Sequence, residues 1–513
     1  MIPQRYNVCR LFILLSFLTA SLAAFGQSYC GLENSTVPIP SPTSGAVIVP
    51  SHYSTFTSPS SGYSSYTEPD IVGTTSTCVV WGATNGLSET GQAVTMQNYA
   101  TQNPFNADDS LISVANTSGT NYIVKNPALG NGGGVVVSPN NMPASTTWII
   151  VWDTANPAVF YYGQGSSVMK GTIGGTSCNS SAKWNGAPNC TVTTTTLYTS
   201  PSYSNLQFNE QDVSADGLHF WIADAGQDTG STVHFLLMTL NSTNATSATL
   251  TATVTLDGTG GKSLGYHKPG ILPNNYLFIN PDSGNDALYN TSGNLVINTL
   301  QSQGGHADFG TDPVTGKIVG VSVWYQGTSA NGCTDGSYYG GVGLLDLQPG
   351  DSSFNTVIRC LSLNSPENYS GLQGGGWHYS WRDTSANWIV SDMITAGSGC
   401  PSSSAPQCFN SMQPSTSNWD ARQEEIVAWN AQGTEIMRLV HHRSREGGNG
   451  GGYWSQPRPA ISRDGQYIAF TSNFNISSGD SVEGTTNVFV IPFQVGSVTP
   501  PNPPTGLSAN VSQ

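Results

Sequence analysis

The chain has 513 residues, of which 9% are charged and 10% aromatic, and its formal net charge is −15. A negative field of this size disfavours binding to nucleic acid and to anionic membranes, and beyond residue 26 no apolar run is long enough to span a bilayer. Abundant Ser, Thr, Asn and Gly favour short strands joined by turns over helices. We therefore predict an all-β protein with no nucleic-acid partner and no membrane span.

Residues 1–26 are predicted to be a secretory signal peptide. Arg5 and Arg10 precede an apolar run over residues 11–26, which ends in an acceptable small-residue cleavage site. A membrane anchor is the alternative, and it is disfavoured because polar sequence follows at once. We expect the mature chain to be extracellular or periplasmic.

Three further regions follow along the chain. Residues 27–70 are rich in Ser, Thr, Pro and Tyr, which predicts a linker or an extended N-terminal arm. Residues 71–497 carry recurring strand signals and are predicted to form one β-propeller. Residues 498–513 resemble the start of a fibronectin type III domain, but such a domain needs about 90–100 residues, so a flexible tail is expected.

Cysteine usage predicts disulfides. Of the nine cysteines, Cys9 lies in the signal peptide, and an even number remains for an exported chain. Pairing of neighbours is the simplest expectation, although other connectivities are open. The expected pairs are Cys178 with Cys190, Cys333 with Cys360, Cys400 with Cys408 and, by elimination, Cys30 with Cys78.

A repeated unit is clearest in two segments, QDVSADGLHFWIAD (residues 211–224) and RPAISRDGQYIAFTS (residues 458–472). Each predicts a strand, a tight Asp-Gly turn and a second strand. Units of this kind begin near residues 103, 146, 211, 267, 306, 378 and 458. Repeats with several strands each are typical of propeller blades, so we predict seven blades; the first two units are the least regular, which leaves six or eight open.

Residues 424–440 (EEIVAWNAQGTEIMRLV) have high helix propensity but also fit two strands around a turn at residues 431–433. The repetition on either side favours strands. The clearest units resemble TolB-type propeller repeats, whose hallmark is a Ser-x-Asp-Gly turn such as Ser214–Gly217 or Ser462–Gly465. This resemblance implies the fold and leaves the activity open.

Alignment of the units on their turns shows one polar position that recurs before the inner strand. The residues at this position are Glu210, His267, His306, His378 and Arg458, with Gln102 in the first unit. Inner strands line the central channel of a propeller, so equivalent residues should meet at its mouth. Glycine-rich stretches and aromatic residues, which suit close approach to a sugar face, stand beside them. We expect these neighbours to bind a ligand: Trp377, Trp381, Tyr453, Trp454 and Gln456.

Three neutral imidazoles, His267, His306 and His378, could hold a divalent metal such as Mn, Zn or Ca. The arrangement is similar to oligogalacturonate lyases, propellers that place histidines and a glutamine around a manganese ion at the channel mouth. That resemblance implies His306 or His378 as a catalytic base and Arg458 as the cation that stabilises an enolate-like state.

The sequence therefore supports two hypotheses about function. The first is a secreted propeller that engages an extracellular glycan at the channel mouth, either as a carbohydrate-binding protein or as a polysaccharide lyase. The second is a non-catalytic scaffold or protein-interaction propeller whose polar channel holds only ordered water.

Overall fold

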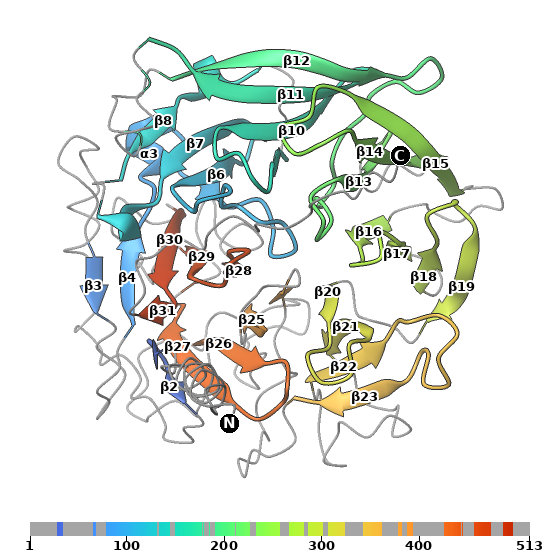
Figure 1. The fold of residues 1–513 in the computed structure, drawn as a ribbon. Helices are drawn as coiled ribbons and strands as arrows, with labels where there is room; N and C mark the ends of the chain where they lie inside the picture. Colours follow the sequence, from blue (N-terminus) through green and yellow to red (C-terminus); the bar gives the residue numbers. More distant parts are fainter. Residues whose placement is uncertain are drawn as a thin grey trace, which may run out of the picture.

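The structure is a computed structural model that describes residues 28–33, 65–67, 78–130, 133–143, 149–176, 178, 184, 190–210, 212–225, 232–256, 266–281, 286–300, 306–323, 342–361, 378–381, 387–392, 425–442, 444, 456–472 and 486–495. Strands dominate these residues. Seven sheets stand in a ring around a central axis (Figure 1). This arrangement confirms the predicted all-β fold with seven blades.

The blades follow one another along the chain, and each is an antiparallel sheet with its first strand innermost. Blade 1 contains β5 (Thr95–Met96), β6 (Leu111–Asn116), β7 (Asn121–Lys125) and β8 (Val135–Val137), and blade 2 contains β9 (Val151–Trp152), β10 (Val159–Gln164), β11 (Ser167–Gly174) and β12 (Thr191–Thr199). Blade 3 contains β13 (His219–Ala223), β14 (Val233–Leu240) and β15 (Ala248–Leu256), and a bridge between Gln207 and Ala223 adds its inner segment.

Blades 4 to 6 continue the ring. Blade 4 contains β16 (Tyr266–Ile271), β17 (Leu277–Pro281), β18 (Asp286–Tyr289) and β19 (Leu295–Leu300), and blade 5 contains β20 (Asp308–Thr311), β21 (Ile318–Val323), β22 (Val342–Asp346) and β23 (Val357–Cys360). Blade 6 contains β24 (Tyr379–Ser380), β25 (Trp388–Asp392), β26 (Glu425–Asn430) and β27 (Ile436–His441). β26 and β27 are the two strands that were predicted in place of a helix. The described helical turns are α3 (Gly86–Thr90), η2 (Pro127–Leu129) and η3 (Pro139–Asn141).

Blade 7 closes the ring with strands from both ends of the chain. β28 (Ala460–Ile461), β29 (Tyr467–Ser472) and β30 (Asn487–Pro492) pair onward to β4 (Val79–Gly82) and β3 (Ser65–Thr67). Two short strands also come from the segment predicted to be an arm: β2 (Leu32–Glu33) extends blade 6, and β1 (Ser28–Tyr29) pairs with β31 (Gln494–Val495). The two ends of the chain therefore hold the ring shut.

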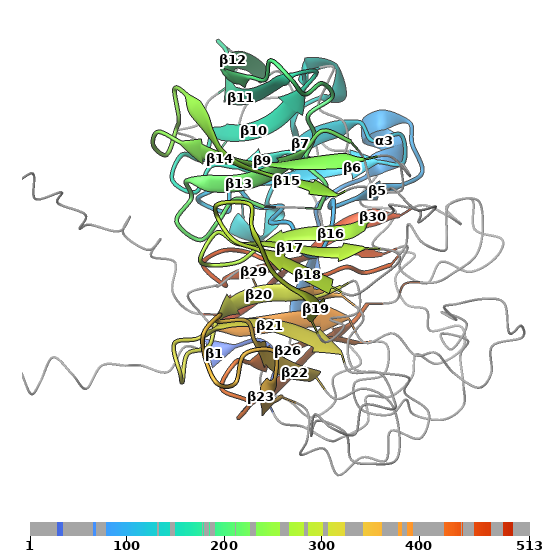
Figure 2. The same cartoon turned by 90° about the vertical axis from the view of Figure 1, so that its right-hand side faces the viewer.

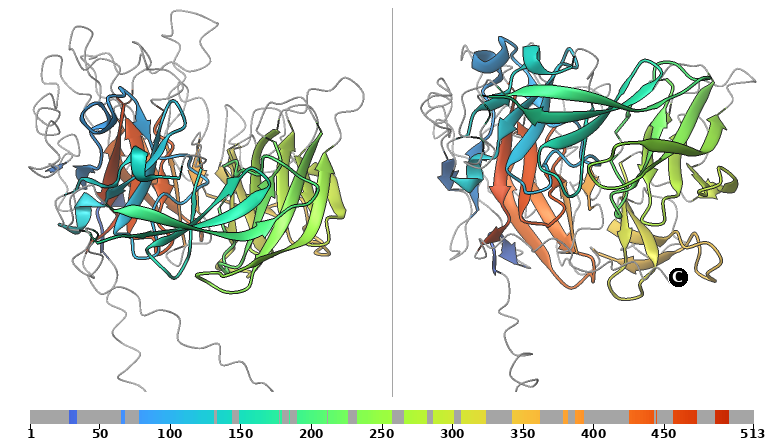
Figure 3. Two further views of the ribbon diagram at one scale, coloured as in Figure 1. Left: turned by 90° about the horizontal axis from the view of Figure 1, so that it is seen from above. Right: turned by 45° about the horizontal axis from the view of Figure 1, so that its top comes forward.

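Strand periodicity explains how the core is filled. Successive side chains of a strand point to opposite faces of its sheet, so each blade packs against two neighbours. In β10, Phe160 and Tyr162 pack toward blade 1, whereas Val159 and Tyr161 pack toward blade 3. The described residues form seven buried apolar clusters, one for each interface between adjacent blades. Figure 3 shows the blades as separate twisted sheets around the axis.

The Ser-x-Asp-Gly turns define one face of the ring. In blade 3, Asp216 Oδ1 accepts hydrogen bonds from the Ser214 hydroxyl and from the Leu218 backbone N–H. Gly217 has φ +71°, which favours glycine, and a Cβ there would lie 2.1 Å from Thr154 Oγ1. Glycine is therefore required at this position both by the backbone conformation and by the close contact with Thr154. We call this end the turn face and the opposite end, where inner strands begin, the entrance face; the strands run between them in Figure 2.

Two predicted disulfides are present, Cys30–Cys78 and Cys178–Cys190. Cys360 is also disulfide-bonded, and its partner lies outside the described residues, as do Cys333, Cys400 and Cys408. Disulfides fit an extracellular or periplasmic location. Among the described residues, no helix is both long and apolar enough to cross a bilayer.

Candidate functional site in the central channel

The inner strand of blade 1 is interrupted by residues 97–103, which we call the channel segment. Met96 pairs with Ala115 of β6, and the next contact with β6 is the hydrogen bond from the Ser113 N–H to the Pro104 oxygen. The seven residues of the channel segment therefore lie opposite one residue of β6. Such an excess of residues on one strand must bulge away from the sheet. Figure 1 shows this part of the chain reaching toward the centre of the ring.

Several blades hold the channel segment in place. Gln97 donates from Nε2 to the backbone oxygens of Pro457 and Arg458 in blade 7, and Gln102 donates to the Ile150 oxygen in blade 2. The Thr101 hydroxyl donates to the Glu210 backbone oxygen in blade 3 at 3.0 Å. These contacts fix the position of the one aromatic side chain that the segment carries, Tyr99.

Tyr99 brings four side chains together, and we call Tyr99, His306, His378 and Arg458 the channel cluster. The Tyr99 hydroxyl lies 2.9 Å from Nδ1 of His306, a hydrogen bond that either atom could donate. The rings of His306 and His378 have centroids 4.6 Å apart, and the Arg458 guanidinium lies 5.4 Å from the Tyr99 ring centroid. Side chains from blades 1, 5, 6 and 7 therefore meet at one place.

Asp392 holds His378 in a single orientation. Its two carboxylate oxygens accept from the backbone N–H of His378 and from ring Nδ1, each at 2.8 Å, and both side chains have 0% exposure. Burial alone would raise the pKa of Asp392, but the charge of His378 and its two hydrogen bonds outweigh burial and leave the pKa below the usual 3.8. Asp392 is therefore a fixed anion that orients the imidazole.

Arg458 is the buried cation of the cluster. Its backbone has φ +43°, and its N–H lies 3.3 Å from Asp392 Oδ2. The guanidinium contacts Gln456 Oε1 at 3.4 Å and the Met96 sulfur at 3.7 Å. A guanidinium within about 6 Å of a ring centroid is attracted by the negative face of the ring, so Tyr99 and Arg458 stabilise each other.

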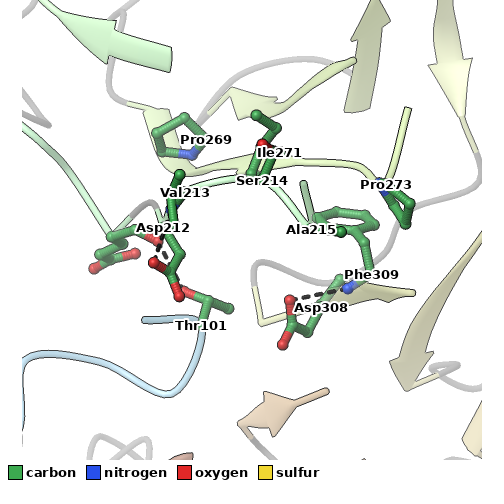
Figure 4. Close-up of a pocket in the computed structure, with 13 residues that line it drawn as sticks. Thr101, Asp212, Val213, Ser214, Ala215, Pro269, Ile271, Pro273, Asp308 and Phe309 are labelled. Carbon is green, nitrogen blue, oxygen red and sulfur yellow. Dashed lines mark hydrogen bonds between the residues drawn. The ribbon is translucent and has the colours of Figure 1, made fainter. Parts of the chain in front are cut away.

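A cavity lies in the channel next to the cluster, between the inner strands of blades 3, 4 and 5. Figure 4 shows Thr101, Asp212 and Asp308 around it, and Glu210 also lines it. Its volume of about 40 Å³ gives room for about three water molecules and excludes a sugar ring. A glycan would therefore have to bind at the entrance face, where half-buried His306 lies, and not inside the channel.

Two of the carboxylates near this cavity have structural partners. The Asp308 carboxylate accepts a hydrogen bond from the backbone N–H of Trp381 in the next blade. The Asp212 carboxylate accepts one from the backbone N–H of Asn103 in the channel segment. Asp212 also pairs with Arg463 of blade 7 at 3.1 Å. This ion pair reaches across the channel from the turn of blade 7 to blade 3, so it narrows the channel toward the turn face.

Asp109 and Asp464 meet at the turn face, in adjacent blades. Burial raises the pKa of Asp109 well above 3.8, and repulsion from Asp464 raises it further. Burial, together with the same two carboxyls, raises the pKa of Tyr467 to about 12. Asp109 also has φ +56°, a conformation that asparagine tolerates well. The folded chain therefore keeps the proton of Asp109 to a higher pH than the unfolded chain does.

Asp109→Asn should stabilise the fold by on the order of 1 kcal/mol at neutral pH. Because the folded pKa is raised, the wild type loses stability as pH rises above 3.8, and the neutral amide removes that loss. Urea unfolding at several pH values measures the difference, which should vanish below about pH 3.8. A variant that is less stable than the wild type at every pH would contradict this assignment.

The remaining predicted site residues have different places. Glu210 is half-buried at the channel cavity with φ +56°, and Gln456 is buried against Arg458. Trp381 has 0% exposure in the core between blades 5 and 6, so it offers no face to a ligand. The backbone of His267 pairs with Asn280 in blade 4, but its side chain lies outside the described part. Trp377, Tyr453 and Trp454 also lie outside the described residues.

The metal prediction finds two of its three ligands close together. His306 and His378 are neighbours, but Nδ1 of His306 faces the Tyr99 hydroxyl and Nδ1 of His378 faces Asp392. Within the described ranges, no group of three or more His, Cys, Asp and Glu side chains could hold an ion. Without the His267 side chain, the metal stays a prediction.

Tyr99 is the member of the channel cluster that sequence reasoning missed. It lies off the repeat register, because the channel segment inserts residues into the inner strand of blade 1. The one signal was the run of amide residues around it, NYATQN (residues 98–103), in a place where other blades continue a strand. Gln102, which the alignment selected instead, bonds to the backbone of blade 2.

The seven sheets define the chain as a seven-bladed β-propeller. No protein-family model and no curated protein matches it, so the TolB-type assignment of its repeats stays a prediction. Among solved structures, oligogalacturonate lyase from Vibrio parahaemolyticus is 12% identical, with a TM-score of 0.47 over 84% of this chain and 97% of that chain.

Other propellers are similar at the same level. The WD40 repeats of RRP9 are 11% identical, with a TM-score of 0.40 over 79% of this chain and 96% of that one. Sqt1 from Saccharomyces cerevisiae is 13% identical, with a TM-score of 0.34 over 77% and 83%. At these identities the likeness extends to the fold alone.

Proposed function

We propose that this protein binds a uronate-containing extracellular glycan at the entrance face and cleaves it by β-elimination. The observation that carries the proposal is the channel cluster, in which a hydroxyl and an imidazole share a hydrogen bond of 2.9 Å beside a buried guanidinium. A paired acid and base with a nearby cation are the groups that an elimination next to a carboxylate requires.

The roles follow from the contacts. His306 is half-buried, whereas His378 is buried with Nδ1 held by Asp392, so His306 is the base and His378 supports it. His306 takes the proton α to the uronate carboxylate, and that electron pair forms a carbon–carbon double bond to the β-carbon. The bond from the β-carbon to the glycosidic oxygen breaks, and this oxygen takes the Tyr99 proton. Proton transfer from His306 to Tyr99 restores both groups.

The charge of the site supports an acidic substrate despite the negative chain. Arg458 contributes a permanent cation next to the acid–base pair, and its field favours the enolate-like state in which negative charge collects on the uronate carboxylate. Since the chain as a whole has a net charge of −15, binding should depend on this local cation and weaken as salt rises.

A panel of uronate-containing polysaccharides, both homopolymers of uronate and heteropolymers with neutral sugars, tests the proposal through the ultraviolet absorbance of unsaturated products, with and without chelator. We expect at least one substrate to be cleaved and His306→Ala to lose about 10²-fold or more of that rate. His219→Ala is the matched control, because His219 pairs with Asp216 at the turn face and should not affect turnover. If no member of this panel is cleaved, the lyase reaction is refuted, and equilibrium binding of the same panel tests a lectin-like role.

The non-catalytic alternative has an observation in its favour. Tyr99, His378 and Arg458 are at most 4% exposed, and each contacts protein groups, which is also how a purely structural polar channel is built. In that case the panel shows neither turnover nor binding, and His306→Ala changes only stability.

A further inference from the structure

A second cavity lies at the entrance face, between blades 2 and 3. It has a volume of about 220 Å³ and lies between the turn that joins β10 to β11 and the start of the inner strand of blade 3. Its lining includes the amide side chains of Gln164, Asn205 and Gln207 and the apolar side chains of Ile149, Leu206 and Phe208. The volume is below the roughly 300 Å³ at which pockets for drug-sized ligands begin, so it suits one small polar unit such as a sugar ring.

The walls of this cavity are fixed by the backbone. The Leu206 N–H donates to the Gly165 oxygen at 2.6 Å, and the Ser200 N–H donates to the Ser166 oxygen at 2.8 Å. A Cβ at Gly163 would lie 1.9 Å from the Leu206 oxygen, so only glycine allows the two blades to approach this closely. A cavity with such walls exists before a ligand binds, which lowers the entropic cost of binding.

The polar groups at the cavity are neutral. Gln164 and Asn205 are exposed and Gln207 is half-buried, and each amide offers both donors and an acceptor. Tyr203, two residues before Asn205, presents a half-buried ring. This ring packs against the apolar cluster between blades 2 and 3. An aromatic ring two residues along the chain from the cavity amides suits a sugar, because apolar C–H groups can cover the ring while hydroxyls bond to the amides.

His234 stands beside this tyrosine in a fixed orientation. Its ring centroid lies 4.7 Å from that of Tyr203. Asp224 accepts from the His234 backbone N–H at 2.8 Å and contacts Nδ1 at 2.7 Å. Asp392 contacts the backbone N–H and Nδ1 of His378 in the same way, but the His234 imidazole is 27% exposed. Its Nε2 is therefore the ring nitrogen that a ligand could reach.

One segment of chain connects this cavity to the channel. Residues Asn205–Phe208 line the second cavity, and Glu210 and Asp212 line the channel cavity beside His306. A glycan bound over the channel cluster can thus extend along the entrance face toward blades 2 and 3.

We propose that the second cavity is a subsite for an uncharged sugar unit of the same glycan chain. This inference rests on the proposed function and deepens it. No charged side chain lines the cavity, and Asp224 follows Ala223, which pairs with the lining residue Gln207, so the nearby carboxylate would repel a uronate here and accept a neutral unit. The substrate class is then a heteropolymer in which uronates and neutral sugars alternate, and not a homopolymer of uronate.

The test compares two sets of oligosaccharides of equal length by calorimetry. Hyaluronan fragments alternate a uronate with a neutral N-acetylhexosamine, whereas oligogalacturonates carry a uronate in every unit. We expect the wild type to bind the alternating set about tenfold more tightly, and Tyr203→Ala to remove that preference. Tyr276→Ala is the matched control, a half-buried tyrosine of blade 4 next to a turn-face loop. Tyr203→Phe, which keeps the ring, should keep most of the preference.

The outcomes separate the two proposals. If the wild type binds uronate ligands but both sets bind equally, or if Tyr203→Ala leaves the preference unchanged, the subsite is refuted and the channel site stands. If the wild type binds neither set, the proposed function fails and the subsite fails with it. Unchanged thermal unfolding of Tyr203→Ala ensures that a lost preference reflects lost contacts.

Discussion

Tyr99→Phe is expected to lower glycan cleavage by about 10²-fold or more while the substrate still binds. The substitution removes one oxygen, which in the wild type lies 2.9 Å from His306 Nδ1. The phenyl ring remains to pack against Arg458 and the two imidazoles, so the geometry of the cluster should persist. Because the proposed protonation of the leaving group occurs only in the reaction, kcat should fall and KM should change little.

Tyr122→Phe provides the control for this experiment. Tyr122 belongs to the same blade, and its buried hydroxyl bonds to Thr95 and Glu89 at a place outside the channel. Both variants should lose about 1 kcal/mol of stability from the missing hydrogen bond, yet only Tyr99→Phe should lose turnover. Equal turnover in Tyr99→Phe and the wild type would show that Tyr99 only positions His306.

The fold could be predicted from the sequence because each blade repeats the same pattern of strands and turns. Two well-formed Ser-x-Asp-Gly turns gave the register, and strand alternation gave the two faces of each blade, so even residues 424–440 were assigned to strands in spite of their helix propensity. Closure by β3 and β4 was not predicted, because nothing in a short strand identifies a partner some four hundred residues away.

The site was only partly readable for the same reason. Alignment on the turns selected His306, His378 and Arg458, which the structure places in one cluster. It could not select Tyr99, which lies on an insertion outside the repeat. Trp381 was predicted to bind a ligand because it stands beside a glycine-rich stretch, although period-two alternation directs that side chain into the core between blades. Alignment of the repeats thus identifies residues at equivalent positions of the blades, but it misses residues on insertions such as the channel segment.

Asp392→Asn is expected to cost about 3 kcal/mol of stability at neutral pH, because buried N–H groups of His378 lose the charged acceptor of their hydrogen bonds. The amide keeps the shape of the side chain but provides one acceptor for the His378 N–H and ring, where the carboxylate provides two. Catalysis should fall as well, since His378 would lose its fixed orientation beside His306.

The pH dependence identifies the cause. The folded-state pKa of Asp392 lies below 3.8, so its contribution is fully present above that pH and is lost as pH falls through the folded value. The difference between wild type and Asp392→Asn should therefore shrink in acid, as urea unfolding between roughly pH 2 and pH 7 would show. Asp224→Asn is the matched control, because it removes the equivalent carboxylate from His234. The His234 and Asp224 side chains are 27% and 15% exposed, so this substitution should cost about 1 kcal/mol of stability or less. Equal losses in the two variants would mean that burial of the Asp392–His378 pair does not set its energy.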